Sequence, residues 1–356
     1  MNTMSKLYVD AREACVLQRT GKGQWARGFI EELLKRDIPV TLLTHTNIPR
    51  EWYIPPERVL HLPFGWRWHV SALRVLRRVD ISCALYVSPT SFIVPSFLPR
   101  NFPFIPIIHD LIAFRPEPHD WHARMIERLL LPRIVRRAQH ICTASAHTRD
   151  DLLARYPFLE PTRVTPIFAG PMQKSPPLNT GDRNIVLCVG TLCPRKNQLR
   201  LIQAYSSLPE TLRSQYQLVL VGGRGWHDTE ILRAVKTTPG VQWKDYAGDD
   251  EYTELLTHCT LLALPSLYEG FGLQVLDALQ RGVPLLTSQC GSLPEVTGSV
   301  TCAVDPYDVA SIAQGLTALL TDAALRNRLQ REGPEQAAQF SWKRTVDLFL
   351  SSVHDT

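Results

Sequence analysis

Residues 264–284 read LPSLYEGFGLQVLDALQRGVP and contain the strongest pattern in the chain. The apolar run Thr260–Leu264 is typical of a buried strand. A loop with Glu269 and two glycines follows it, and a helical pattern over Leu273–Gln280 begins just beyond Gly272. The segment therefore predicts a strand–loop–helix unit of a parallel α/β sheet, with its polar loop at the carboxyl end of the strand.

The residue types in this loop indicate a ligand with both phosphate and hydroxyl groups. The backbone N–H groups of Gly270–Leu273 lie at the expected start of the helix, where an anion is favoured. Asp277 follows Glu269 by eight residues, about two helical turns, so both carboxylates face the same general side. Carboxylates accept hydrogen bonds from neighbouring hydroxyls, and N–H groups bind phosphoryl oxygens. This combination fits a diphosphate that has hydroxyls at both ends.

A second polar loop follows the predicted strand Asn184–Val189 and leads into the helical pattern Asn197–Leu208. It contains Arg195 and Lys196, which we expect at the start of that helix. Two cations are unfavourable at a helix N-terminus unless an anion is bound there. We therefore interpret the pair as a clamp for a diphosphate. The alternative is a solvated Arg-Lys pair at a helix end.

The N-terminal half also alternates between strands and helices, which predicts a second parallel sheet. His109 lies at the carboxyl end of a predicted strand, where α/β proteins bind ligands, although a wall residue with one hydrogen bond fits the same position. Gly21 and Gly23 flank Lys22 in a turn that allows close backbone approach, but an ordinary turn explains this pattern equally well. The strands are Val40–Thr44, Ala84–Ser88 and Phe104–His109, and the helices are Trp25–Leu34 and Ala123–Ala138.

Length and composition indicate a two-domain globular protein. The chain has 356 residues, 44% of them hydrophobic and 21% charged. The segment Ala169–Asp182 is rich in Pro and Gly and predicts a linker. We predict domains over residues 1–170 and 171–340. A final helix, Lys343–Ser352 with Ser341 as its N-cap, belongs to a C-terminal segment over residues 341–356.

The two halves differ in charge. Residues 1–170 hold 23 Lys and Arg against 15 Asp and Glu, whereas residues 171–356 hold 16 against 19. Basic residues beside aromatic ones suit an anionic membrane surface, and a solvated basic face is the equal alternative. No nucleic-acid recognition module is evident. The two basic clusters are Arg67, Arg74 and Arg78, and Arg124, Arg128, Arg133, Arg136 and Arg137.

The sequence argues against export and against a disulfide or zinc scaffold. No apolar run is long enough to span a membrane, and Met1–Val9 has no apolar signal core. The eight Cys are scattered and form no Cys-x-x-Cys pair. We therefore expect a cytoplasmic protein, with peripheral contact at the inner face of the cytoplasmic membrane if the basic clusters bind lipid.

The combined motifs resemble retaining glycosyltransferases of family 4. The segment from Glu269 to Asp277 resembles their Glu-x7-Glu motif, and the resemblance extends through Gly291–Val296, Val304–Pro306 and Phe340–Trp342. It implies the GT-B fold, in which two doubly wound Rossmann-like domains face each other across a cleft and a C-terminal helix crosses back. The N-terminal domain would bind the acceptor and the C-terminal domain the nucleotide sugar.

The resemblance also implies roles for individual residues. Glu269 would hold hydroxyls of the donor sugar, and Asp277 would hold the ribose of the nucleotide. Arg195 and Lys196 would neutralise the leaving diphosphate. One departure is that Asp277 stands where the family has Glu, a side chain one methylene longer. His109 would lie on the acceptor side near the reacting sugar carbon, and phosphate and sugar would contact Gly21, Gly23, Gly270, Phe271, Gly272 and Leu273.

The implied reaction is transfer of a hexosyl group with retained anomeric configuration. The first guess for the donor is GDP-mannose, and for the acceptor a glycan or lipid-linked saccharide of lipopolysaccharide, O-antigen or exopolysaccharide synthesis. The sequence lacks Asp-x-Asp, so no cofactor and no metal site are expected. Two alternatives remain open at this point. One is another GT-B enzyme, a sugar-nucleotide epimerase or a phosphorylase, and the other is a non-enzymatic sugar-nucleotide-binding protein.

Overall fold

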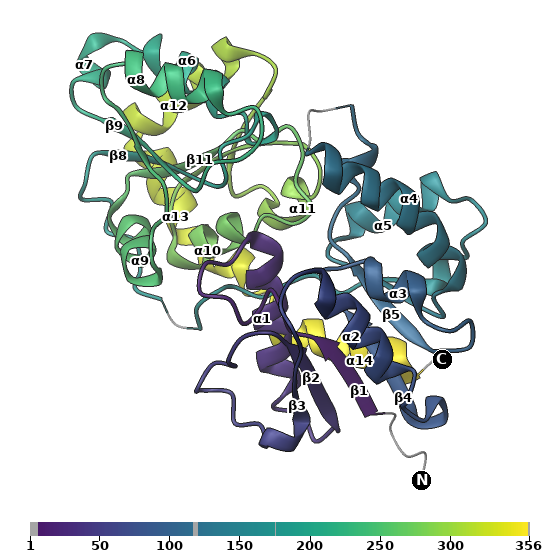
Figure 1. Cartoon of the computed structure of the whole chain (residues 1–356). Helices are drawn as coiled ribbons and strands as arrows, with labels where there is room; N and C mark the ends of the chain where they lie inside the picture. The colour runs from purple at the N-terminus through teal and green to yellow at the C-terminus, as the bar shows by residue number, and fades with distance from the viewer. Residues whose placement is uncertain (1–5, 117–119, 175, 355–356) are drawn as a thin grey trace. The chain divides into compact units, whose positions relative to one another are not determined.

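The computed structural model describes residues 6–116, 120–174 and 176–354 (Figure 1). The chain divides into two compact units. The N-terminal unit contains the residues up to Phe114, Trp121–Met172 and the segment from Phe340 onward. The C-terminal unit contains Gln173–Gln339 together with Arg115 and Asp120.

The described strands of the N-terminal unit form a parallel sheet in the order β3-β2-β1-β4-β5-β6-β7. The central strands β1, β2, β4 and β5 are apolar along most of their length because helices cover both faces of the sheet. The strands are β1 (Lys6–Asp10), β2 (Val40–Thr44), β3 (Val59–His61), β4 (Ala84–Ser88), β5 (Phe104–Ile108), β6 (Ile141–Thr143) and β7 (Val164–Pro166).

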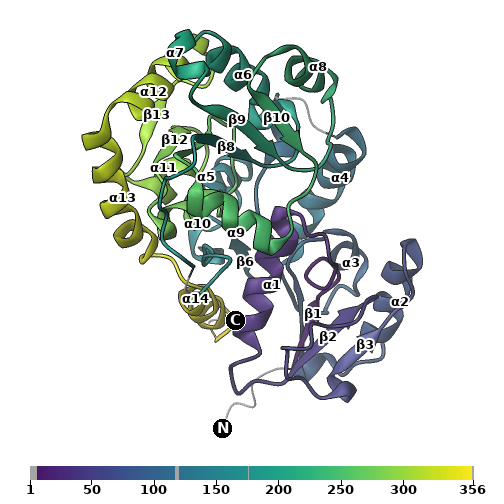
Figure 2. The ribbon, with the colours of Figure 1, turned by 90° about the vertical axis from the view of Figure 1, so that its left-hand side faces the viewer.

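Helices of the N-terminal unit cover both faces of this sheet. On one face α2, α3 and α4 share a single apolar core with the strands. On the other face α1 and α14 pack together, and the Phe29 and Phe349 ring centroids are 5.1 Å apart (Figure 2). The helices are α1 (Gly21–Leu33), α2 (Trp66–Leu76), α3 (Ile93–Phe97), α4 (Trp121–Arg137), α5 (Ala146–Arg155) and α14 (Trp342–His354), with short 3₁₀ turns η1 (Pro56–Arg58), η2 (Ile81–Cys83), η3 (Ile112–Phe114) and η4 (Pro161–Arg163).

The C-terminal unit has a second parallel sheet, ordered β10-β9-β8-β11-β12-β13. Helices α6, α8 and α12 lie on one side of it, and α9, α10 and α13 lie on the other (Figure 1). The elements are β8 (Ile185–Val189), η5 (Pro194–Lys196), α6 (Gln198–Ser206), α7 (Glu210–Arg213), β9 (Gln217–Val221), α8 (Thr229–Thr237), β10 (Val241–Lys244), α9 (Asp249–His258), β11 (Leu261–Leu264), α10 (Leu273–Arg281), β12 (Leu285–Ser288), α11 (Leu293–Thr297), β13 (Cys302–Val304), α12 (Val309–Thr321) and α13 (Ala323–Ala337).

Each sheet reverses its strand order at one place. In the N-terminal unit the reversal lies between β1 and β4, and in the C-terminal unit it lies between β8 and β11. Loops diverge at such a reversal and leave a crevice at the carboxyl ends of the strands, where open α/β sheets bind ligands. The topology therefore marks one candidate binding edge in each unit.

Most of the predicted elements are present, with shifted ends. Strands β2 and β4 have the predicted bounds. Helix α1 begins at Gly21 instead of Trp25, because the Thr20 hydroxyl accepts a hydrogen bond from the Gly23 N–H at 3.2 Å. The prediction that Ser341 caps the last helix is confirmed, since its hydroxyl accepts the Arg344 N–H at 3.2 Å.

The grouping of two segments differs from a simple division of the chain. The last helix belongs to the N-terminal unit, as the predicted fold requires. Arg115 was placed with the N-terminal half by the sequence, but it groups with the C-terminal unit. Its guanidinium lies 4.6 Å from the centre of the Tyr268 ring of the same unit. Within the described parts of the chain, no helix combines the length and the hydropathy needed to cross a bilayer.

The contact between α1 and α14 gives a stability prediction. A Cβ added to Gly28 would lie 2.1 Å from the Trp342 ring, which is held by a 2.8 Å hydrogen bond to the Pro171 carbonyl. Gly28→Ala should therefore lower the free energy of unfolding by about 1–3 kcal/mol, measured by urea denaturation. The matched control is Gly21→Ala in the same helix, where a Cβ meets no described atom within 4 Å. Equal stability of the two variants would contradict this packing.

Candidate active site

Glu269 lies in the loop after β11, and the backbone around it is held by the loop before α11. Ser292 donates to the Glu269 carbonyl through both its backbone N–H, at 3.0 Å, and its hydroxyl, at 3.1 Å. Gly291 has a φ of +65°, and a Cβ there would come within 2.4 Å of the same carbonyl oxygen. A glycine is therefore required at position 291, and the Glu269 side chain has a fixed starting point.

The Glu269 carboxylate binds both predicted cations. Arg195 donates to Oε2 at 2.9 Å, and Lys196 donates to Oε1 at 2.7 Å. Arg195 also donates to the Tyr268 carbonyl at 2.8 Å, and its own carbonyl accepts the Leu267 N–H. The Arg195–Glu269–Lys196 cluster therefore joins the loops after β8 and β11, the two strands that flank the strand-order reversal.

The position of the two cations differs in one respect from the prediction. They do not begin α6 but form the 3₁₀ turn η5, which Pro194 opens and Asn197 closes at a φ of +61°. The Asn197 amide donates to the carbonyls of Pro265 and Pro306, at 2.9 and 2.7 Å. This side chain stabilises the left-handed turn and directs the two preceding residues toward Glu269 instead of along the helix.

Glu269 stays ionised although it is only 5% exposed. Burial raises its pKa, but the charges of Lys196 and Arg195 and the hydrogen bonds from Lys196 and Ser266 outweigh burial and lower the pKa to about 2. One carboxylate against two cations leaves the cluster with one net positive charge. A partly buried net positive charge at this edge favours an anionic ligand.

The N-terminus of α10 adjoins Glu269. Gly272, with a φ of +96°, is its N-cap, and the buried side chains of Phe271 and Leu273 fix the turn on either side of it. The first N–H groups of a helix have no carbonyl partner within the helix and favour phosphate oxygens. The predicted backbone site over Gly270–Leu273 therefore lies in the same unit as the charged cluster.

Asp277 lies deeper in the C-terminal unit. It is fully buried, and its neighbours include Tyr252 and Arg281. Burial raises the pKa of the Tyr252 hydroxyl, and the Asp277 charge raises it further. Arg281 donates to the Gln173 side chain at 2.8 Å. The sequence analysis missed Tyr252 and Arg281, although Arg281 is four residues from Asp277 and so on the same helix face.

His109 follows β5 in the N-terminal unit. Its Nε2 is 2.7 Å from the Pro89 carbonyl, which only accepts, so Nε2 carries the proton. The imidazole meets the Trp25 ring edge-on at 5.1 Å. Burial, followed by the charge of Lys22, lowers its pKa to about 4. His109 is therefore neutral at pH 7.

The structure assigns the predicted residues to two places. Arg195, Lys196, Glu269 and the start of α10 lie together in the C-terminal unit. Gly21, Gly23 and His109 belong to the N-terminal unit, where Lys22 pairs with Glu127 at 3.5 Å, a partner that the sequence analysis missed. In the described parts of the chain, no group of three or more His, Cys, Asp or Glu side chains could hold a metal ion.

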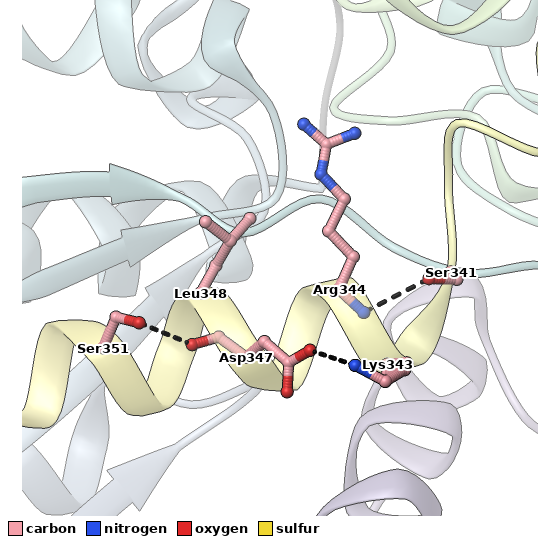
Figure 3. Close-up of a pocket in the computed structure, with 6 residues that line it drawn as sticks. All are labelled: Ser341, Lys343, Arg344, Asp347, Leu348 and Ser351. Carbon is pink, nitrogen blue, oxygen red and sulfur yellow. Dashed lines mark hydrogen bonds and ion pairs between the residues drawn. The ribbon is translucent and has the colours of Figure 1, made fainter.

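Figure 3 shows a hollow that lies along α14 of the N-terminal unit. Lys343 pairs with Asp347, one turn further along the same helix, at 2.8 Å. None of the side chains that the sequence assigned to the active site lines it. The lining residues are Ser341, Lys343, Arg344, Asp347, Leu348 and Ser351.

Comparison with known families shows which family the chain belongs to. Residues 172–336 match the family described as "Glycosyl transferases group 1", and residues 20–170 match "Glycosyltransferase Family 4". The chain belongs to this family of glycosyltransferases. It is therefore a transferase and not a non-enzymatic sugar-nucleotide-binding protein, the alternative that the sequence left open.

Two relatives agree with the assignment of the chain to the glycosyltransferases. O-antigen chain mannosyltransferase B of Escherichia coli is 32% identical over 279 residues, 74% of this chain and 72% of that protein. Serotype-specific mannosyltransferase WbdA of the same organism is 34% identical over 170 residues, 46% of this chain but only 21% of that longer protein.

The solved structures show the GT-B fold. Sucrose-phosphate synthase from Thermosynechococcus elongatus has a TM-score of 0.76 at 18% identity, with 98% of each chain covered. WaaG, a glycosyltransferase involved in lipopolysaccharide biosynthesis, has a TM-score of 0.69 at 17% identity, with 97% of this chain and 98% of that chain covered.

The environment of His109 gives a pH prediction. Its pKa is about 4 in the folded chain against an ordinary 6.5, so between these pH values the unfolded chain binds a proton that the folded chain does not. Stability should therefore fall as pH falls through this window, by up to about 1.4 kcal/mol per pH unit.

The control for this prediction is His109→Gln, which keeps a donor for the Pro89 carbonyl but does not titrate. Urea denaturation at pH 7, 6, 5 and 4 should show the stability of the wild type declining relative to this variant. Parallel curves would show that folding does not suppress protonation of His109.

Proposed function

We propose that this glycosyltransferase moves a mannosyl group from GDP-mannose to a glycan or lipid-linked saccharide during synthesis of O-antigen or another surface polysaccharide. The names of the relatives support the sugar and the pathway, because both of the Escherichia coli proteins described above are mannosyltransferases. The single observation that carries the proposal is the Arg195–Glu269–Lys196 cluster beside the start of α10.

The cluster has spare hydrogen-bonding capacity for a diphosphate. A Lys ammonium has three N–H donors and an Arg guanidinium has five. Lys196 donates one N–H to Glu269, and Arg195 donates to Glu269 and to the Tyr268 carbonyl. The remaining Lys196 donors can bind phosphoryl oxygens while the carboxylate keeps both cationic side chains in place, so the clamp is preorganised before the donor arrives.

The proposed step retains the anomeric configuration. The bond between the anomeric carbon and the diphosphate oxygen breaks, and its electron pair goes to that oxygen, where Arg195 and Lys196 offset the charge. The acceptor hydroxyl bonds to the same face of the sugar, and its proton passes to the departing phosphate. We assign Glu269 to hydroxyls of the donor sugar, Asp277 to the ribose and neutral His109 to the neighbourhood of the reacting carbon.

The assignment of Asp277 requires a local rearrangement. Its carboxylate is fully buried near Tyr252 and Arg281, so a ribose reaches it only after α10 or the Asp277 side chain moves. The side chain is also one methylene shorter than the Glu of the family motif. Ribose binding should therefore be the weaker part of donor recognition, and the diphosphate clamp the stronger.

The transfer assay with Glu269→Gln tests the proposed function. Gln cannot pair with two cations, so kcat/KM for mannosyl transfer from GDP-mannose should fall about 10²–10³-fold. The matched control is Glu254→Gln, which removes a carboxylate from the surface of the same unit and should leave transfer unchanged. Unchanged transfer in Glu269→Gln would contradict the assigned site.

The donor is tested with the same proteins by thermal shift. A ligand that binds only the folded chain stabilises it by about 2.7 kcal/mol at a concentration of 100 Kd. GDP and GDP-mannose should raise the melting temperature of the wild type more than UDP and UDP-glucose. A larger shift with the uridine compounds would leave glycosyl transfer in place but overturn GDP-mannose as the donor.

We also propose peripheral contact with an anionic membrane through α4, whose outward side carries an exposed apolar stripe. Four side chains make up this stripe and recur at helical spacing on one side of α4. One of them, Leu129, is 68% exposed. Arg133 and Arg136 are exposed in the last turns of the same helix and would meet lipid phosphates. The stripe consists of Trp121, Met125, Ile126 and Leu129.

The basic clusters predicted from sequence are only partly surface features. Arg137 donates to carbonyls at the end of α3, including those of Leu98 and Pro99, and so stabilises the fold. Arg124 and Arg128 both donate to the Ala113 carbonyl. Arg67 and Arg74 are exposed on α2, because Trp68, Ala72 and Leu76 form its buried side. Arg78, just beyond the end of α2, is also exposed.

Sedimentation with vesicles tests the membrane contact. The wild type should bind vesicles that contain phosphatidylglycerol at low salt, and Leu129→Glu should weaken this binding because it places a like charge in the stripe. The matched control is Leu178→Glu, which changes an equally exposed Leu of the C-terminal unit, 67% exposed. Failure of the wild type to bind, or equal loss in both variants, would overturn the contact.

A further inference from the structure

The loop after β1 holds one guanidinium in a fixed position at the strand-order reversal of the N-terminal unit. The Asp10 carboxylate is fully buried and accepts from Arg12 Nε at 3.2 Å, from Arg12 Nη2 at 3.0 Å and from the Arg12 backbone N–H at 3.1 Å. The guanidinium carbon also lies 3.8 Å from the centre of the Trp68 ring. Arg12 is therefore preorganised, and little side-chain entropy is lost when a ligand binds to it.

Two histidines extend this arrangement toward β2 and α2. Arg12 Nη1 is 3.4 Å from His69 Nε2, and because Arg only donates, Nε2 accepts and the proton of His69 lies on Nδ1. Burial, followed by the positive charge of Arg12, lowers the pKa values of both His69 and His45. Both imidazoles are therefore neutral at pH 7. His69 uses its Nε2 to position Arg12, and its Nδ1 is buried, so His45 is the imidazole that can exchange hydrogen bonds with hydroxyl groups.

An exposed aromatic ring lies beside these polar groups. Phe64, in the loop between β3 and α2, is 79% exposed, and its ring centroid is 5.1 Å from that of His45. A large apolar side chain this exposed has lost little of its hydration and can still bury a ring face against a ligand. A pyranose offers the matching surfaces, with C–H bonds on its face and hydroxyls around its edge.

The charges in this region indicate a neutral ligand. The Arg12 guanidinium is paired with Asp10 through two of its nitrogens, and both nearby histidines are uncharged at pH 7. The group therefore lacks the net positive charge of the Arg195–Glu269–Lys196 cluster. A phosphate group gains most from cations that are not already neutralised, whereas hydroxyls need only neutral donors and acceptors.

We propose that Arg12, His45, Phe64 and His69 form a binding subsite for a neutral saccharide, the acceptor glycan, and that this subsite selects against phosphorylated acceptors. This inference rests on the proposed function, because a bound saccharide is an acceptor only if the protein transfers a sugar to it. Phe64 stacks on a sugar ring, His45 hydrogen-bonds its hydroxyls, and the remaining Arg12 N–H donors fix its orientation.

The test uses the full chain and two independent readouts. Saturation-transfer NMR measures binding of a soluble α-linked mannose disaccharide, and initial rates with GDP-mannose measure the KM for the same disaccharide. Phe64→Ala should weaken binding and raise the acceptor KM by about five- to tenfold, without changing the KM for the donor. Phe64→Trp should retain near wild-type values, because it keeps an aromatic face.

Two controls make the result specific to the subsite. Phe158→Ala removes a half-exposed aromatic from the same unit, near β7 at the other end of the sheet, and should change neither readout. The 6-phosphorylated form of the disaccharide should bind at least tenfold more weakly than the neutral form. Preference for the phosphorylated form, or an acceptor KM within twofold of wild type in Phe64→Ala, would overturn the proposal.

The outcomes also separate this proposal from the proposed function and from lipid binding. If the wild type binds the disaccharide through Phe64 but transfers no sugar from any nucleotide donor, the subsite stands and the proposed function fails. If the wild type transfers sugar and Phe64→Ala changes neither disaccharide binding nor the acceptor KM, the proposed function stands and the subsite is wrong. If Phe64→Ala reduces only the binding of phosphatidylglycerol vesicles, Phe64 belongs to a membrane surface and the subsite is wrong.

Discussion

The contact of one buried carboxylate with two cations determines how the C-terminal unit is arranged around its binding edge. A buried ion pair is weak support for stability as such, because desolvation of the charges offsets much of their attraction. Removing one partner is nevertheless costly, so Arg195, Lys196 and Glu269 must be kept together. A cluster with unequal charges is better explained by a ligand than by folding, since an anion supplies the missing negative charge.

The two sheets use the same topological feature for different chemistry. At the reversal between β8 and β11, the loops bring together a net positive charge and a helix N-terminus. At the reversal between β1 and β4, Asp10 neutralises the cation that the loop presents, and the neighbouring imidazoles are uncharged. Under the two proposals above, the first edge would bind the diphosphate of the donor and the second the hydroxyls of a neutral acceptor.

The sequence predicted those features of the fold that depend on the spacing of residues close together in the chain. Short apolar runs predicted the bounds of β2 and β4. The Arg195-Lys196 pair indicated a diphosphate clamp, which stays a prediction. Contacts between distant segments left no signal of this kind. Arg137 looked like part of a basic surface because nothing in its own helix reveals the carbonyls of α3 that it binds. The left-handed turn at Asn197 likewise depends on carbonyls far along the chain, so the sequence did not predict that Arg195 and Lys196 form a separate 3₁₀ turn before α6.

Asp277 shows how one helix serves two purposes in the C-terminal unit. The end of α10 near Gly272 faces the predicted phosphate site. Four residues after Asp277, the same helix carries Arg281, which donates to Gln173 at the start of this unit. A charge as fully buried as Asp277 needs compensation, and the Arg281 guanidinium on the same helix interacts with it electrostatically. A donor that draws Asp277 toward its ribose must therefore leave the Arg281 guanidinium with less compensation. The family's longer Glu could reach a ribose from the same backbone position, whereas Asp277 makes that reach depend on movement of the helix.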